Sequence, residues 1–243
     1  MIIINADDWG RSRKETEAAF SCFRAGRINS ASAMVFMADS ERAADLANEA
    51  GIDVGLHLNL SQPFTGECRD HALRKHHDRI VHFLTKSKYS VLLYNPALRK
   101  QFRYVYHAQV EEFLRLYGKP PSHVDGHHHK HLCVNMVLDR VIPEGEKVRR
   151  NFSFRPGEKG FMNRAYRRVV DQWLARRYRL TDFFFALPQL FQSGHLSRLI
   201  VLSGKASIEV MVHPAKADDL NCLTSEKYRE MLSRLRTGTY SSL

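Results

Sequence analysis

Short apolar runs alternate along the chain with longer amphipathic stretches, and each kind predicts its own secondary structure. Runs of β-branched and other apolar residues predict short buried strands, at about 2–5, 32–37, 53–60, 122–125, 181–186 and 206–212. Stretches with a helical period and capping signals predict helices between them, at about 12–25, 39–51, 98–117, 161–178 and 224–236. Such alternation is typical of an α/β protein with mainly parallel strands, and we expect one domain over residues 1–243.

The stretch 62–95 follows this alternation least clearly. Pro63 and Gly66 interrupt it early, and a basic, histidine-rich stretch that contains His71, His76 and His77 follows. We therefore expect a long loop here, with room for one helix.

Polar side chains gather where the predicted strands end. Asp7 and Asp8 follow the first strand, His57 lies within the third, His127 follows the fourth, and His213 follows the last. In barrels and open α/β sheets, functional sites lie at the carboxyl ends of the strands. We therefore expect these side chains on one face of the molecule.

The acidic pair Asp7 and Asp8 indicates a cation. Two carboxylates beside a buried apolar run are costly unless positive charge lies close to them, and a divalent metal supplies that charge. Successive side chains in a strand point in opposite directions, so two separate roles are expected. The alternative is that Asp8 only caps the helix that follows.

The histidine cluster is the stronger signal of a metal site. Five histidines lie between residues 123 and 131, and Asp125 lies among them. His127 and His131 are spaced so that they would share one face of a helix, and a carboxylate such as Asp125 can orient a metal-binding imidazole. The alternative interpretations are a solvent-exposed histidine-rich loop or a purification tag, although the run is internal and follows a strand.

Four other side chains are weaker candidates. His57 on its own is more typical of a strand core than of a site. His213, followed by Pro214, is a candidate general acid because the ordinary pKa of histidine lies near neutrality. Glu209, in the strand before it, is a candidate to orient it, and Trp9 is a candidate either to line a sugar site or to pack in the core.

The composition is that of an ordinary globular protein, except for its charge. The 243 residues are 44% hydrophobic, and the formal net charge is +11. Because the basic residues are spread along the chain, we expect a solvated basic surface and no specific nucleic-acid partner. The apolar runs are too short to span a membrane and no signal peptide is recognisable, so a cytoplasmic protein is expected. The four cysteines form no CxxC pair and are expected to be core residues.

Four ordered motifs in this chain resemble those of the YdjC-like carbohydrate deacetylases, a group that includes chitin-disaccharide deacetylases and a hopanoid-biosynthesis-associated branch. They span nearly the whole chain: NADDWG at 5–10, GLH at 55–57, HVDGHHHKH at 123–131 and EVMVHPA at 209–215. Residues 30–34 and 223–225 are also similar to family segments. Any one motif alone would be weak, but four in the family's order are specific.

The resemblance implies a (β/α)-barrel-like fold related to the polysaccharide deacetylases, and a small acetylated saccharide as substrate. It implies a divalent metal, typically magnesium, held by Asp8, His57 and His127; two imidazoles would also suit zinc. By the same resemblance Asp7 is the general base and His213 the general acid or transition-state stabiliser, and a homodimer is plausible.

Three alternative functions remain open at the level of sequence. The first is metal-dependent hydrolysis of another bond, such as a phosphoester; a glycosidase is disfavoured because neighbouring carboxylates cannot straddle a sugar. The second is a non-catalytic basic protein that binds nucleic acid or an anionic surface, with salt-dependent binding. The third is a structural or storage metal protein.

Overall fold

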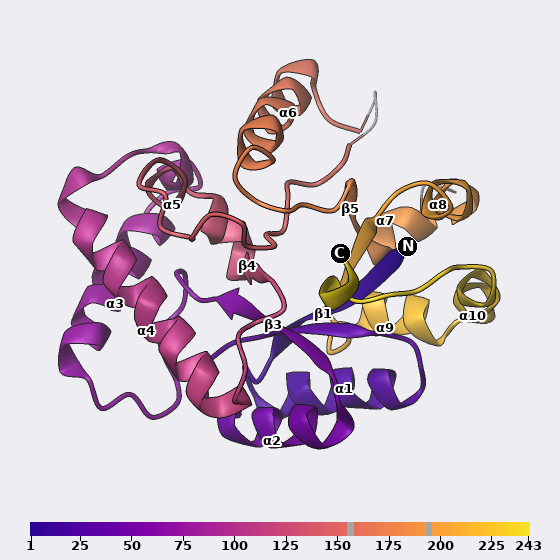
Figure 1. Ribbon diagram of the computed structural model, residues 1–243, viewed down its shortest axis with the longest axis horizontal. Coiled ribbons are helices and arrows are strands. Elements are labelled where there is room, and N and C mark those ends of the chain that lie inside the picture. The colour runs from indigo at the N-terminus through magenta and orange to yellow at the C-terminus, as the bar shows by residue number, and fades with distance from the viewer. Residues whose placement is uncertain (155–157, 193–195) are drawn as a thin grey trace. The chain divides into compact units, whose positions relative to one another are not determined.

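The computed structural model describes residues 1–154, 158–192 and 196–243, and within these ranges strands alternate with helices along the chain (Figure 1). The strands are β1 Ile2–Trp9, β2 Ser30–Ala33, β3 Asp53–Leu58, β4 Val124–Gly126, β5 Phe183–Ala186 and β6 Ile208–Val212. The pairs β1–β6, β3–β4 and β5–β6 are parallel. The predicted α/β fold, with the strand–helix alternation of a (β/α)-barrel-like protein, is confirmed.

The helices fall between the strands, as the amphipathic pattern predicts. The α-helices are α1 Arg13–Arg24, α2 Ser40–Ala50, α3 His71–Thr85, α4 Arg99–Tyr117, α5 Val134–Leu138, α6 Phe161–Leu174, α7 Leu187–Gln192, α8 Leu196–Ser203, α9 Ala217–Thr224 and α10 Glu226–Ser233. Four short 3₁₀ segments are η1 Ser90–Leu92, η2 Pro96–Leu98, η3 His127–Leu132 and η4 Tyr240–Ser242. Across the described ranges, no helix has both the length and the apolar character needed to cross a membrane.

The chain divides into two compact units. The first unit comprises Met1–Ala6, Glu17–Ala31 and Glu144–Leu243, and the second comprises Asp7–Thr16 and Ser32–Pro143. The expectation of one catalytic domain over residues 1–243 stays a prediction.

In the second unit the sheet order is β4-β3-β2, followed by the last residues of β1. The register of the β3–β4 pair sets His57 opposite Asp125 and Leu56 opposite Val124. Helices α2 and α3 pack on α4, and the apolar face of α4 buries Phe102. Because β3 and β4 are parallel neighbours, the polar residues near their carboxyl ends are brought to the same edge.

In the first unit the order is β1-β6-β5. The β-branched residues of β1 pair with β6, with Ile2 opposite Ile208 and Ile4 opposite Val210, and all four side chains are buried. Burial on both faces explains why these strands are continuous apolar runs rather than alternating ones.

The one helix for which the expectation over 62–95 left room is the fifteen-residue helix α3, His71–Thr85. Asp70 caps it by accepting hydrogen bonds from the amides of Ala72 (2.8 Å) and Leu73 (3.1 Å). Its buried face carries Leu73, His77, Ile80 and Leu84, all at helical spacing. The apolar period was obscured because a histidine occupies one of the four core positions.

Candidate metal and catalytic site

The carboxyl end of β1 presents two buried acids. Asp7 and Asp8 are each 4% exposed. Asp8 has a left-handed backbone, with φ at 68°, and such a conformation interrupts the alternation of side chains along a strand. Both carboxylates consequently reach His57, since each has an oxygen within 4.8 Å of one of its ring nitrogens. Regular strand geometry predicts that the two acids point apart, but in the structure both reach His57.

Asp8, His57 and His127 converge on one point. Oδ1 of Asp8 lies 2.9 Å from Nδ1 of His127 and 3.5 Å from Nε2 of His57. One ligand atom from each residue lies within 4.8 Å of the other two, and all three side chains are buried. The two imidazoles meet edge to face, with ring centroids 5.5 Å apart.

These atoms suit a divalent cation. Two ligand atoms about 2.1 Å from one ion lie roughly 3.0–3.4 Å apart when they subtend octahedral or tetrahedral angles. The two measured contacts of Asp8 Oδ1 bracket that range. This oxygen is buried and, among the described residues, accepts no well-aligned hydrogen bond. Its unsatisfied charge is what a cation would balance.

The electrostatics keep Asp8 ionised. Burial alone would raise the pKa of Asp8, but the imidazoles of His127 and His57 hold it well below its usual range. Its second oxygen, Oδ2, lies 3.3 Å from a guanidinium nitrogen of Arg11, which is about a third exposed. Arg11 therefore orients the carboxylate so that Oδ1 faces the imidazoles.

Asp125 fixes the orientation of His57. The Nδ1 group of His57 donates to Oδ1 of Asp125 at 2.8 Å, which directs Nε2 toward Asp8. Ser32 Oγ donates to the other oxygen of Asp125, also at 2.8 Å. A carboxylate that accepts from the far nitrogen of an imidazole is the usual partner of a metal-binding histidine.

A further layer of hydrogen bonds supports Asp125. Ser32 Oγ also lies 3.0 Å from His123 Nε2, and His123 Nδ1 lies 3.0 Å from Ser122 Oγ. The His123 ring packs directly on Gly55, where an added Cβ would come within 2.3 Å of it. Gly55 is therefore required by the close approach of this ring to β3.

Asp7, His57 and Asp125 form a second group whose ligand-type atoms lie within 4.8 Å of one another. Within the described part of the chain, these two groups sharing His57 are the sets with metal-ligand geometry. Asp7 therefore lies beside the group Asp8, His57 and His127, which we call the Asp8 cluster, but it is grouped with His57 and Asp125 instead.

The histidine run after β4 is not a regular helix. His128 and His129 have left-handed backbones, with φ at 53° and 56°, so His127 and His131 do not share a helix face. His131 is buried against Gly126, where a Cβ would lie 2.9 Å from that of His131. Of the run, His127 alone belongs to a group with metal-ligand geometry among the described residues.

The structure places Trp9 in the core. Its side chain is fully buried and its indole donates to the carbonyl of Ala43 at 3.0 Å. Of the two interpretations of this residue, core packing agrees with that burial, and a sugar-facing role does not.

Glu209 and His213 belong to the first unit. Buried Glu209 accepts from Arg149 Nε at 2.7 Å and from the hydroxyl of Tyr240. The amide of His213 donates to Asp219 Oδ1 at 3.0 Å, which fixes the backbone at the end of β6. The expected role of Glu209 toward His213 stays a prediction.

Nothing in the sequence marks Ser32 or Arg11 as part of a site. Ser32 lies in the segment 30–34, which is similar to a family segment, but nothing in its type indicates a partner of Asp125. Arg11 is one of many basic residues spread along the chain. Both residues can be recognised only in the folded structure, because each acts through a contact with a side chain that another element positions.

The fold and the site together define a class of protein: a parallel α/β protein with a buried carboxylate–imidazole cluster at the carboxyl ends of its strands. The model of the YdjC-like protein family matches residues 1–235. The chain belongs to this family.

Curated relatives match over different lengths. A chitooligosaccharide deacetylase from Proteus mirabilis is 28% identical over 270 aligned residues, which cover 100% of this chain and 92% of that protein. A chitooligosaccharide deacetylase from Yersinia enterocolitica is 27% identical, covering 99% and 98%. A carbohydrate deacetylase from Danio rerio is 32% identical over 59% of this chain and 46% of its own length.

A solved structure has the same fold. It is the crystal structure of an Enterococcus faecalis V583 protein described as a cellobiose-phosphate cleavage protein, with a TM-score of 0.68. The alignment covers 99% of this chain and 97% of that one at 16% identity, which establishes likeness of fold alone.

Proposed function

We propose that this protein is a metal-dependent deacetylase that removes the acetyl group from an N-acetylated sugar or short oligosaccharide. The observation that carries the proposal is the convergence of Asp8, His57 and His127 on one point, with the carboxylate of Asp7 beside them. The names of the full-length relatives, chitooligosaccharide deacetylases, supply the substrate class.

In this proposal Asp8, His57 and His127 hold the cation, magnesium or zinc. When bound, such a cation would polarise the acetyl carbonyl and lower the pKa of water. By accepting from Nδ1, Asp125 holds Nε2 of His57 on the side of Asp8, where it would be available as a ligand. Asp7 takes a proton from the attacking water, and His213 gives a proton to the amine that leaves.

Acetate release tests the proposed reaction and its metal requirement. We expect the purified protein to release acetate from N-acetylglucosamine oligomers, with one new amine for each acetate. A chelator should abolish this release, and added magnesium or zinc should restore it, because the proposed cation would supply both the polarisation of the carbonyl and the lowered pKa of water.

A phosphoester panel run in parallel separates the main alternative. Phosphate release from sugar phosphates without acetate release from any N-acetylated sugar would contradict the proposal and favour phosphoester hydrolysis. Acetate release that continues undiminished after complete metal removal would contradict the role given to Asp8, His57 and His127.

Metal affinity should rise with pH, because the cation must displace a proton from His57. Burial alone would lower the pKa of His57, but the charges of Asp125 and Asp7, the hydrogen bond to Asp125 and the nearby carboxylate of Asp8 raise it to about 10. The imidazole is therefore protonated at neutral pH when no metal is bound. Below this pKa each added pH unit should strengthen binding by about tenfold.

Isothermal titration calorimetry with magnesium or zinc, between about pH 6 and 9, measures this dependence. Repeating the titration in buffers with different ionisation enthalpies counts the protons released for each metal bound. Affinity that does not change with pH, with no proton released, would show that His57 is not a ligand.

A further inference from the structure

Net positive charge gathers in two segments of the chain, residues 147–179 of the first unit and residues 71–103 of the second unit. Residues 71–103 contain eight Lys and Arg but a single acid, Asp78, and thus carry more than half of the net charge of +11. Exposed basic side chains recur every three or four residues along α3 and at the residue that follows it: Lys75, Arg79, His82 and Lys86. This spacing places them on one side of the helix.

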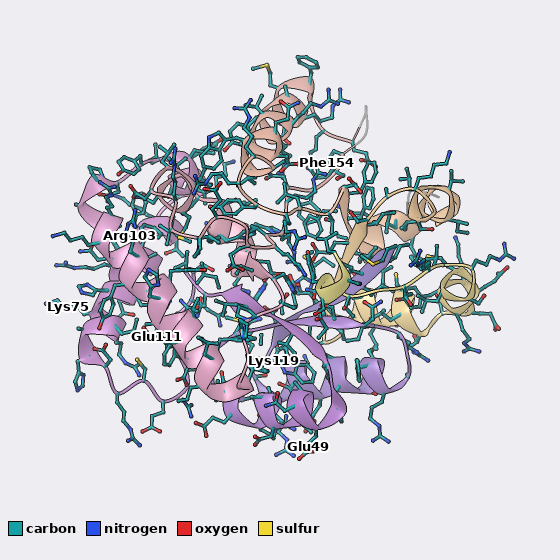
Figure 2. The ribbon with its side chains drawn as sticks, viewed as in Figure 1. Glu49, Lys75, Arg103, Glu111, Lys119 and Phe154 are labelled. Atoms are coloured by element: carbon teal, nitrogen blue, oxygen red, sulfur yellow. The ribbon has the colours of Figure 1, made fainter. Side chains whose placement is uncertain are left out.

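The same side of α3 borders a broad hollow of about 880 Å³, which Asn95, Ala97 and Leu98 also line. Its charged lining consists of Arg74, Lys75, Arg79 and Lys86 with Asp78 as the one acid. In the ion pairs of the described residues, Lys75, Arg79 and Lys86 have no carboxylate partner. Lys75, labelled in Figure 2, projects outward from α3.

Exposed apolar side chains follow directly after α3. Tyr89 is 60% exposed, Leu92 48%, Leu93 57% and Tyr94 41%. The ammonium group of Lys88 lies 5.1 Å from the centre of the Tyr89 ring. Single exposed leucines are common on protein surfaces, but four large apolar side chains within six residues, next to a row of cations, are not.

These basic and apolar side chains are carried by elements that pack on the core of the second unit. The opposite side of α3 buries Leu73, Ile80 and Leu84, and the helix packs along α4. Contacts between α3 and η1 fix the start of the apolar segment against the helix. The cations and the apolar side chains therefore form one preformed surface, which we call the basic face.

We propose that the basic face docks this protein on the surface of an anionic lipid bilayer. Lysine and arginine near anionic headgroups supply salt-dependent attraction, and leucine and tyrosine side chains insert at the headgroup boundary. Nucleic acid fits the surface less well, because Leu92 and Leu93 offer nothing to a sugar–phosphate backbone or to base stacking. The inference does not depend on the proposed deacetylase activity.

Sedimentation with lipid vesicles tests the proposal on the full chain. We expect the protein to bind vesicles of phosphatidylcholine with phosphatidylglycerol, to bind vesicles of phosphatidylcholine alone weakly, and to lose binding to the mixed vesicles as salt is raised. Each cation lost from the basic face should weaken partitioning about fivefold. The triple variant Lys75→Gln, Arg79→Gln, Lys86→Gln should therefore bind about 100-fold more weakly.

Matched variants separate the basic face from overall charge. The triple variant Lys14→Gln, Arg24→Gln, Lys119→Gln removes the same charge from exposed positions elsewhere and should lose much less binding; Lys119 is labelled in Figure 2.

A second pair of variants tests the apolar side chains in the same assay. The double variant Leu92→Ser, Leu93→Ser should weaken binding to mixed vesicles. The double variant Leu114→Ser, Leu220→Ser, at positions 41% and 40% exposed, should not.

Three outcomes would overturn the proposal. The first is equal binding to neutral and anionic vesicles. The second is an equal loss in the two charge variants, which would indicate a general charge effect. The third is binding to an oligonucleotide that depends on Lys75, Arg79 and Lys86, without binding to vesicles. Thermal unfolding of every variant checks that a loss of binding does not reflect a loss of folding.

Discussion

The variant Asp7→Asn should keep its metal and lose turnover by about 100- to 10,000-fold, the usual contribution of a general base. Asparagine has the shape of aspartate but cannot accept the proton of the attacking water. Asp7 lies beside the Asp8 cluster and shares His57 with it, yet it is not a member of the group Asp8, His57 and His127. The measurement is the kcat for acetate release, together with metal affinity by calorimetry.

The exposed acid Asp78 provides the control for this change, since Asp78→Asn removes the same charge from the surface of α3. That variant should turn over normally. Normal turnover by Asp7→Asn would remove Asp7 from the reaction, and loss of metal binding by the same variant would make it a ligand instead of a base.

The variant His127→Ala should weaken metal binding by more than about 100-fold. Removing a residue that only supports a ligand typically costs 10- to 100-fold in affinity, so removing a ligand itself should cost more. The nitrogen of His127 that faces Asp8 is 2.9 Å from the carboxylate, and its loss would leave the charge of Asp8 buried beside one imidazole. Calorimetry and the metal content of the purified protein measure the effect.

His131 offers a matched control in the same run of histidines. It is equally buried, but it is not a member of either group with metal-ligand geometry in the described residues. His131→Ala should therefore lower the melting temperature while leaving metal affinity close to that of the unchanged protein. The metal affinity of Asp125→Asn should lie between those of His127→Ala and His131→Ala, with a loss of about 10- to 100-fold.

Wild-type affinity in His127→Ala would exclude this imidazole from the metal site. An equal loss of affinity in His131→Ala would instead show that the whole run is needed for the fold of the site, and that the individual assignment is wrong.

Local sequence signals were sufficient to place the site along the chain. Apolar runs mark the strands and the polar residues after them mark the carboxyl ends, whereas the choice of Asp8, His57 and His127 as the ligand set came from the resemblance to the YdjC-like family. Capping signals located five of the ten α-helices of the described residues to within a few residues; the helix predicted over 98–117 is Arg99–Tyr117 in the structure. The same reasoning left room for one helix in 62–95 but did not place α3, because the buried position of His77 hides the helical period of its core face.

Other features of the site depended on how strands are paired and how the backbone turns. The register that sets His57 opposite Asp125 fixes which nitrogen faces Asp8, and no local pattern encodes that register. The left-handed backbone of Asp8 lets two neighbouring acids reach one imidazole, although regular strand geometry predicts that they diverge. A regular helix would place His127 and His131 on one face, but the left-handed backbone at His128 and His129 separates them.

By itself, then, the sequence determined the order of the elements and the residue types that gather at the strand ends, because hydrophobic period and side-chain chemistry are local properties of a chain. Only the tertiary structure decided which of those side chains meet, that Ser32 and Arg11 join them, and that the cations of α3 lie beside exposed leucines. The physical reason is that these contacts depend on strand register, backbone conformation and packing between elements distant in sequence, and each of these is fixed by the whole fold.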